Sequence, residues 1–136
     1  MSHQVTTVFN QGMSFTAQIN QHKVIMDSND NHELEAGPSP KRLMLAAFAG
    51  CTGIDVVSIL NKMKVNFSDF SIDITATLTE EHPKIYNHVN VTYKIKVDPS
   101  DQPKMEKAVN LSQEKYCGVS AMFKAFAKVE TEIIYL

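Results

Sequence analysis

The sequence of 136 residues lacks any basic block or tail. Thirteen Lys and Arg stand against fifteen Asp and Glu, which gives a formal net charge of −2 with neutral histidines. Proteins that bind nucleic acid or an anionic membrane surface usually concentrate positive charge on one segment or face. We therefore expect neither nucleic acid nor a membrane among its partners.

We also expect no secretory signal, because residues 1–7 show no positively charged segment followed by an apolar one. We therefore expect a cytoplasmic protein, and the length fits a single domain over residues 1–136. Cysteine is scarce, with only Cys51 and Cys117. In the cytoplasm such a pair is more often two free thiols or a redox couple than a structural bridge.

Motifs for metals, phosphates and serine nucleophiles are absent as well. The sequence has no glycine-rich phosphate loop and no nucleophile elbow. The histidines lie in predicted loops or at exposed strand positions without metal-ligand spacing. They are His3, His22, His32, His82 and His88. We therefore predict no metal and no cofactor.

What is present is one long apolar stretch, residues 43–60. Its polar residues are Thr52, Asp55 and Ser58. It follows Gly37-Pro38-Ser39-Pro40, a favourable helix start, because Ser is a good N-cap and Pro fits the first helical turn. The sequence predicts a helix from Lys41 to about Met63. Because no face of this helix is free of apolar residues, the pattern is typical of a helix buried nearly all round.

A transmembrane helix is the competing interpretation of this stretch, and we reject it. The stretch barely reaches the length of about 20 residues that a bilayer requires, and Asp55, Gly50 and Gly53 interrupt it. The small residues favour close approach of another backbone. Since one small domain seldom covers a helix on every side, we predict a homodimer in which a second copy helps to cover it.

The remaining segments predict an α+β fold. Residues 4–10 and 13–19 alternate in polarity, which indicates a hairpin with one buried face. The other predicted elements are a strand at 22–27, a loop at 28–37, strands at 70–78 and 86–97, a helix at 102–112 capped by residues 98–101, a break at 113–116, a helix at 117–127 and a strand at 129–135. The order βββ-α-ββ-αα-β predicts antiparallel β-sheets around the long buried central helix.

The two cysteines are the best candidates for chemistry. Cys117 lies at the start of a predicted helix, where free N–H groups and the helix dipole can lower the pKa of a thiol. Cys51 lies in the middle of an apolar helix, which favours the neutral thiol unless a cation or donor approaches it. Asp55 shares the face of Cys51, and its charge opposes a thiolate. Without a Cys-x-x-Cys pair, spacing alone favours inert thiols.

Two motifs change that balance. Gly37-Pro38-Ser39-Pro40 followed by Leu-Met-Leu-Ala-Ala-Phe-Ala-Gly-Cys51-Thr, and later Glu114-Lys115-Tyr116-Cys117-Gly118-Val119-Ser120, resemble the two cysteine motifs of the OsmC/Ohr superfamily of organic hydroperoxide reductases. The order of elements agrees along the whole chain. The run Cys-Thr-Gly-Ile-Asp-Val-Val and the Glu-Lys-Tyr-Cys signature resemble its YhfA-type, OsmC-like branch most.

The resemblance implies an intertwined homodimer with thiol sites at the subunit interface. Cys51 would attack the peroxide and become a sulfenic acid, and Cys117 would resolve it as a disulfide. An external dithiol reductant would restore both thiols. An apolar surround would favour organic hydroperoxides over hydrogen peroxide. The apolar candidates, which fit a plain core equally well, are Met44, Phe48 and Met122.

The sequence departs from the family pattern at the activating pair. Well-studied members carry an acidic residue just after the helix-starting proline and an arginine in the N-terminal region. Here Lys41 and Arg42 follow that proline, and Arg42 is the only arginine. Nine helical residues place it about 13 Å from Cys51 and on the opposite side. Either Arg42 reaches the partner subunit's Cys51, with Glu33 or Glu35 as its carboxylate, or Lys41 and Arg42 are solvated.

Three functional hypotheses follow. The first is a thiol-dependent peroxidase that acts through Cys51 and Cys117. The second is a non-catalytic dimer whose interface pocket binds a small hydrophobic or thiol-reactive ligand. The third is a structural dimer with inert cysteines. Reaction of the thiols with a peroxide or an alkylating probe would separate them.

Overall fold

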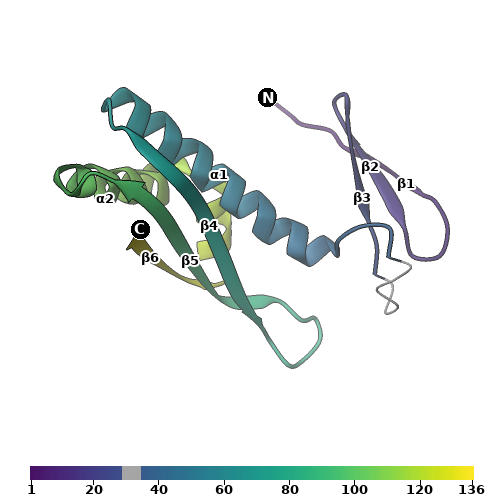
Figure 1. Cartoon of the computed structure of the whole chain (residues 1–136). Helices are drawn as coiled ribbons and strands as arrows, with labels where there is room; N and C mark the ends of the chain where they lie inside the picture. The colour runs from purple at the N-terminus through teal and green to yellow at the C-terminus, as the bar shows by residue number, and fades with distance from the viewer. Residues whose placement is uncertain (29–34) are drawn as a thin grey trace. The chain divides into compact units, whose positions relative to one another are not determined.

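A computed structural model of the chain describes residues 1–28 and 35–136. They form two compact units, Met1–Leu45 and Ala46–Leu136 (Figure 1). The elements follow the order βββ-α-ββ-αα-β, which confirms the predicted α+β fold. The assignment of residues 1–136 to a single domain stays a prediction. Most of the loop predicted at 28–37 lies outside the described residues.

The N-terminal unit contains a three-stranded antiparallel meander, as predicted. Its strands are β1 (Thr6–Phe9), β2 (Phe15–Ile19) and β3 (His22–Met26), in the order β1-β2-β3. The turns between them use left-handed backbone at Gly12 (φ 59°) and Asn20 (φ 54°). Glycine and asparagine tolerate that conformation best, which explains why the chain reverses at these points.

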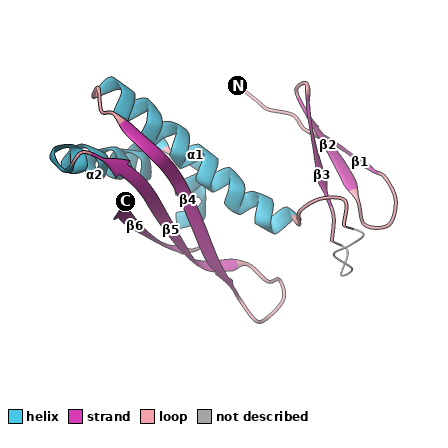
Figure 2. Ribbon diagram, in the orientation of Figure 1, coloured by secondary structure: helices cyan, strands magenta, loops and turns pink. Residues whose placement is uncertain are grey.

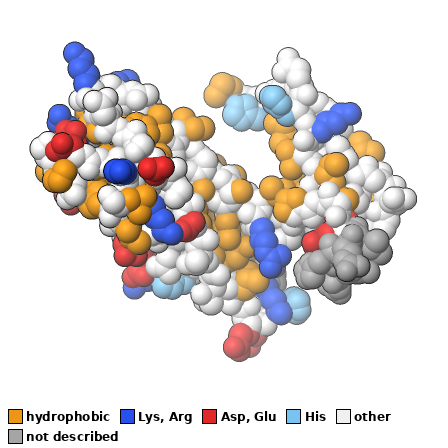
Figure 3. All heavy atoms as spheres, viewed as in Figure 1, with side chains coloured by type: hydrophobic (Ala, Val, Ile, Leu, Met, Phe, Trp, Pro, Cys, Tyr) orange, Lys and Arg blue, Asp and Glu red, His pale blue; other side chains and the backbone are white. Residues whose placement is uncertain are grey.

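The predicted buried face of this sheet is open in a single chain. Ala17 is buried, but the side chains of Phe9 and Phe15 are 57% and 40% exposed. Figure 3 shows hydrophobic side chains reaching the surface of this unit. Polarity alternation sorts side chains onto two faces of a strand, but it does not show what covers the apolar face. The expectation of a buried face was therefore wrong for the single chain.

The end of β3 is tied to the segment that precedes the central helix. The buried carboxylate of Asp27 accepts hydrogen bonds from the backbone N–H groups of Ser28 (2.7 Å) and Ala36 (3.0 Å). The N–H of Asp27 donates to the carbonyl oxygen of Pro38 at 3.1 Å. These bonds hold the helix start against the strand within the N-terminal unit.

The central helix α1 spans Pro40–Lys62, which confirms the predicted helix. Its buried residues are Phe48, Thr52, Val56 and Leu60. Their spacing of four places them on one stripe. Other apolar residues of α1 are not covered in a single chain, and Ile54 is 73% exposed. The prediction that a second copy covers the rest of the helix stays a prediction.

Length and composition alone would also let α1 cross a membrane. Its most apolar window has a mean hydropathy of 2.0, and 22% of that window is buried within the chain. The core helix of a soluble protein meets the same criterion.

The C-terminal unit contains a sheet of order β4-β5-β6, drawn in magenta in Figure 2. The strands are β4 (Phe67–Leu78), β5 (Tyr86–Val97) and β6 (Lys128–Tyr135). β4 pairs with β5 antiparallel, but β6 pairs with β5 in parallel, so the expectation of purely antiparallel sheets was wrong here. A parallel neighbour requires a long crossover, and the helical segment between β5 and β6 provides it.

That crossover contains four helical pieces. They are η2 (Pro99–Asp101), α2 (Gln102–Leu111), the π-helical turn η3 (Ser112–Tyr116) and α3 (Gly118–Lys124). Asp98 starts the crossover as predicted, since its carboxylate accepts the N–H of Ser100 at 2.9 Å. The predicted break at 113–116 is instead the wide turn η3, and the chain becomes extended only at Cys117 (φ −77°, ψ 101°).

Candidate active site

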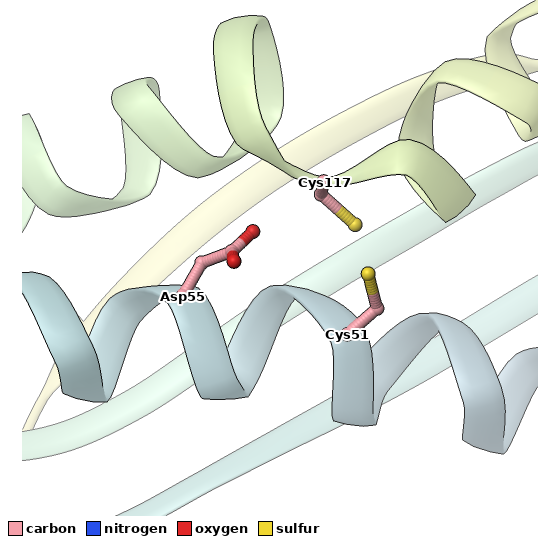
Figure 4. Close-up of side chains that lie close together, drawn as sticks. All are labelled: Cys51, Asp55 and Cys117. Carbon is pink, nitrogen blue, oxygen red and sulfur yellow. The ribbon is translucent and has the colours of Figure 1, made fainter. Parts of the chain in front are cut away.

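Two of the three predicted site residues, Cys51 and Cys117, lie together with Asp55. Cys51 and Asp55 stand one turn apart on α1, and Cys117 faces them from the start of α3 (Figure 4). The two Sγ atoms and a carboxylate oxygen of Asp55 all lie within 4.8 Å of one another. Both cysteines are free thiols. The chain therefore builds a dithiol–carboxylate cluster from residues 51, 55 and 117.

The backbone around Cys117 holds its sulfur toward α1. Its N–H donates to the carbonyl oxygen of Ser112 at 2.8 Å, which closes the π-helical turn. Its Sγ accepts the N–H of Ser120 at 3.3 Å, so the cysteine side chain caps α3. The residue is only 4% exposed, whereas Cys51 is half-buried. Cys51 is therefore the more accessible thiol.

Burial raises the pKa of the Cys117 thiol from 9.0 to about 11. The hydrogen bond with Cys51 and the negative charges of Cys51 and Asp55 add to this effect, and the N–H of Ser120 opposes it. We expected the helix start to lower this pKa, and that expectation was wrong. A helix of seven residues has a weak dipole, and loss of hydration outweighs the single N–H group. The expectation that Asp55 opposes a thiolate at Cys51 stays a prediction.

A buried network of hydroxyl groups contacts the dithiol–carboxylate cluster through Asp55. The hydroxyl of Thr52 forms hydrogen bonds with Tyr93 Oη (2.6 Å) and Ser112 Oγ (2.7 Å). Ser112 Oγ in turn donates to Asp55 Oδ2 at 3.0 Å. Burial is also the main cause that raises the pKa of Tyr93, so this phenol stays protonated. The network fixes the carboxylate of Asp55 from the core side.

The network continues to the other side of Cys117. Gln113 Nε2 donates to Tyr93 Oη at 2.7 Å, and Gln113 Oε1 accepts the hydroxyl of Ser120 at 2.6 Å. Ser120 is the residue whose N–H contacts the Cys117 sulfur. Among the described residues, every buried side-chain nitrogen and oxygen atom has a hydrogen-bond partner. A continuous chain of polar contacts therefore links Asp55 to Ser120.

Sequence reasoning missed this network. Thr52 was visible as a polar residue in an apolar helix, and Ser112 lay on the apolar side of the predicted helix 102–112. Those signals showed which side chains would need buried partners. They did not show that the partners would be each other, because the contacts join residues as many as 60 positions apart.

Arg42, the third predicted site residue, lies in the first turn of α1 in the N-terminal unit. Its side chain is exposed, and Nη1 donates to Ser39 Oγ at 3.5 Å. The groups that shift the pKa of Cys117 do not include it. Glu33, one of its two predicted carboxylate partners, lies outside the described residues, and Glu35 is half-buried. The role of Arg42 stays a prediction.

The apolar candidates differ in burial. Phe48 is fully buried and packs against Phe123, with ring centroids 4.9 Å apart, so it belongs to the core. Met44 and Met122 are exposed. Among the described histidines, His88 Nε2 forms a hydrogen bond with Glu130 Oε2 at 2.9 Å.

An open groove with a mostly apolar lining runs between α1 and β4. It is lined by Ala49, Gly50, Gly53, Ile54, Val57, Phe70, Ser71 and Ile72. A Cβ atom at Gly53 would lie 3.1 Å from Ile72 Cδ1, so this glycine allows helix and strand to approach closely. A Cβ atom at Gly50 would have no neighbour within 4 Å. The groove therefore offers uncovered apolar surface beside small residues.

A family comparison adds to this geometry. The model of the OsmC-like protein family matches residues 30–132, well over half of the chain. The chain belongs to the OsmC-like family. Protein YhfA of Escherichia coli K12 is 33% identical over 115 residues, which cover 84% of each chain. This agrees with the resemblance that the two cysteine motifs indicated.

Solved structures of other proteins share the OsmC-like fold. A hypothetical protein from Aquifex aeolicus VF5 superposes with a TM-score of 0.87 at 27% identity, covering 100% of this chain and 97% of the other. The organic hydroperoxide resistance protein OhrB of Bacillus subtilis superposes with a TM-score of 0.65 at 17% identity, covering 98% of each chain. The OhrB comparison, at that identity, shows the fold alone.

Proposed function

We propose that this OsmC-like protein is a thiol-dependent peroxidase that reduces organic hydroperoxides through Cys51 and Cys117. The observation that carries the proposal is the approach of the two sulfur atoms to within 4.8 Å in a partly buried cluster. The fold shared with OhrB, an organic hydroperoxide resistance protein by name, supports the substrate class.

In the first step, the Cys51 thiolate attacks the peroxide. An S–O bond forms while the O–O bond breaks, so sulfur is oxidised by two electrons to a sulfenic acid. The departing alkoxide takes a proton and leaves as an alcohol. Cys51 is assigned this step because it is half-buried and accessible. Cys117 is buried, and its pKa of about 11 keeps it a neutral thiol at pH 7.

In the second step, Cys117 resolves the sulfenic acid. Its sulfur attacks the Cys51 sulfur, the S–O bond breaks, and the hydroxide combines with the thiol proton and leaves as water. A disulfide needs sulfur atoms about 2.05 Å apart, so the thiols must move closer from their separation of at most 4.8 Å. An external dithiol in the cytoplasm then supplies two electrons and two protons through a mixed disulfide.

The working form in this proposal is a homodimer. The exposed apolar residues of α1, the uncovered sheet of the N-terminal unit and the groove lined by residues such as Gly50 and Ile54 all provide surface for a second copy. Apolar surface of this kind also suits the organic part of a hydroperoxide. In the dimer, Arg42 would supply the positive charge that favours the partner subunit's Cys51 thiolate.

Intact-mass spectrometry of the reduced protein after brief exposure to cumene hydroperoxide tests the cysteine couple. We expect loss of two hydrogen atoms per chain, faster than with hydrogen peroxide. Cys51→Ser should prevent any oxidation, and Cys117→Ser should accumulate one added oxygen at Cys51. No change at either thiol of the unmodified protein would contradict the proposal. Undiminished binding of a hydrophobic probe by Cys51→Ser would then favour the ligand-binding hypothesis.

Substitution of Arg42 tests its assignment. An opposite charge within about 4–6 Å lowers a pKa by roughly one to three units, so Arg42→Gln should shift the pH profile of peroxide consumption upward by a similar amount. Lys41→Gln, which removes the neighbouring cation, is the matched control. If the profile of Arg42→Gln coincides with that of the control, Arg42 is a solvated residue.

A further inference from the structure

The cluster of Cys51, Asp55 and Cys117 presents three ligand atoms that a metal ion can share. We propose that the reduced protein binds one Zn²⁺ ion per chain through the two Sγ atoms and the Asp55 carboxylate. Histidine spacing had indicated no metal site. The assignment comes from side chains that α1 and α3 bring together, and it does not depend on peroxide reduction.

The spacing of the three atoms suits zinc. Zn–S bonds measure about 2.3 Å and Zn–O bonds about 2.0–2.2 Å, so tetrahedral ligands lie roughly 3.4–3.8 Å from one another. The ligand atoms here lie within 4.8 Å of one another before any metal is present. Small side-chain rotations therefore suffice to surround the ion. Three protein ligands would leave a fourth position open to water or another small ligand.

Neighbouring groups already orient two of the ligands. Ser112 Oγ donates to Asp55 Oδ2 at 3.0 Å, and the N–H of Ser120 donates to Cys117 Sγ at 3.3 Å. Groups that hydrogen-bond to metal ligands in this way fix the direction of the ligands and strengthen the site. A carboxylate retains accepting capacity after one such bond, so the contact with Ser112 is compatible with coordination.

The negative charge of the three ligands favours a divalent cation. Two thiolates and one carboxylate would carry three negative charges within 4.8 Å of one another. A divalent cation replaces the two thiol protons, which are released to solvent, and leaves one net negative charge. Thiolate ligands favour zinc over the oxygen-preferring ions Mg²⁺ and Ca²⁺.

The test is an anaerobic titration of the reduced, full-length protein with Zn²⁺ in competition with a chromophoric chelator. Native mass spectrometry gives the stoichiometry. We expect one ion per chain and no response to Mg²⁺. Loss of an outer-shell partner weakens metal binding about 10–100-fold, so Cys51→Ser and Cys117→Ser should each weaken it by more than about 100-fold. Substitution by Co²⁺ should give thiolate charge-transfer absorption.

Asp55→Asn tests the third ligand, and Asp73→Asn is its matched control. Asp73 is an exposed residue of β4 that pairs with Lys94, so its substitution should leave zinc affinity unchanged. Asp55→Asn should weaken zinc binding at least tenfold while the Co²⁺ thiolate absorption persists. Equal affinities of Asp55→Asn and Asp73→Asn would overturn the three-ligand site. Stoichiometric binding that survives Cys51→Ser, or no binding by the reduced protein, would overturn the proposal outright, whatever the peroxide assay gives.

Discussion

The two cysteines have different environments, and this difference sets their chemistry. Cys117 is buried and lies close to a carboxylate, which raises the pKa of its thiol. Cys51 is more open to solvent. From the sequence, both residues were identifiable as the reactive candidates, but the direction of the Cys117 shift was not. The burial of Cys117 depends on its packing near α1, which is distant in the sequence, so the local sequence did not show that its pKa would rise.

The raised pKa of Cys117 predicts a pH dependence of stability. The folded protein holds the thiol proton up to about pH 11, whereas an unperturbed thiol releases it near 9.0. The native state therefore binds more protons between these values, and the free energy of unfolding must fall as pH rises through this window. Below pH 9 the contribution is fully present.

Urea denaturation of the reduced protein at several pH values, with a chelator present, measures this effect. Cys117→Ser should show a shallower fall in the free energy of unfolding between pH 9 and 11. The free energy of unfolding of Cys117→Ser should still fall in part with rising pH, because burial also raises the pKa of Tyr93. Identical slopes for the two proteins would show that the proton on Cys117 contributes nothing.

At the scale of elements, the buried hydroxyl network joins α1, β5 and the crossover. Tyr93 Oη is bonded to both Thr52 and Gln113, so loss of this hydroxyl leaves two buried polar groups short of a partner. An unsatisfied buried group costs about 1–3 kcal/mol. The network is therefore a source of stability and of orientation for Asp55.

Tyr93→Phe should lower the free energy of unfolding by about 1–3 kcal/mol, measured by urea denaturation at neutral pH. Tyr116→Phe is the matched control, because Tyr116 is exposed, and we expect a change within about 0.5 kcal/mol. A Tyr93→Phe protein as stable as the control would contradict the structural role of the network.

Local patterns predicted most elements because their causes are local. Ser39 and Pro40 mark the start of α1, and strict alternation marks β4 and β5. The parallel pairing of β6 and the π-helical turn before Cys117 were not predictable in this way. Strand direction depends on where the crossover returns the chain, and a wide helical turn has no clear sequence signal.

At the scale of the whole molecule, the single chain leaves much apolar surface uncovered. Phe9 and Phe15 on the N-terminal sheet and Ile54 on α1 are all exposed. The apolar character of α1 on all sides was visible in the sequence, and from it we predicted a second copy. The apolar pattern does not show where a second copy would lie on the chain, so no interface could be predicted from it.

Ile54→Glu should dissociate the proposed dimer into monomers, because the substitution places a charge in the apolar groove beside α1. Analytical ultracentrifugation across a range of concentrations measures the change, for which we expect at least a tenfold weaker association. Asn110→Glu, which adds the same charge at an exposed position of α2, should leave association unchanged. A dimer equally tight in both variants would exclude the groove from the interface.

The positions of Cys51 and Cys117, 66 residues apart in the chain, also define a covalent ring. If oxidation joins the two sulfurs, the ring encloses β4, β5 and α2 and links α1 to the start of α3. Such a ring restricts the unfolded chain much more than the folded one, and by loop-closure entropy it is worth about 4 kcal/mol. Oxidised protein should then melt at a higher temperature than reduced protein. Exposure to peroxide would therefore increase the thermal stability of the protein.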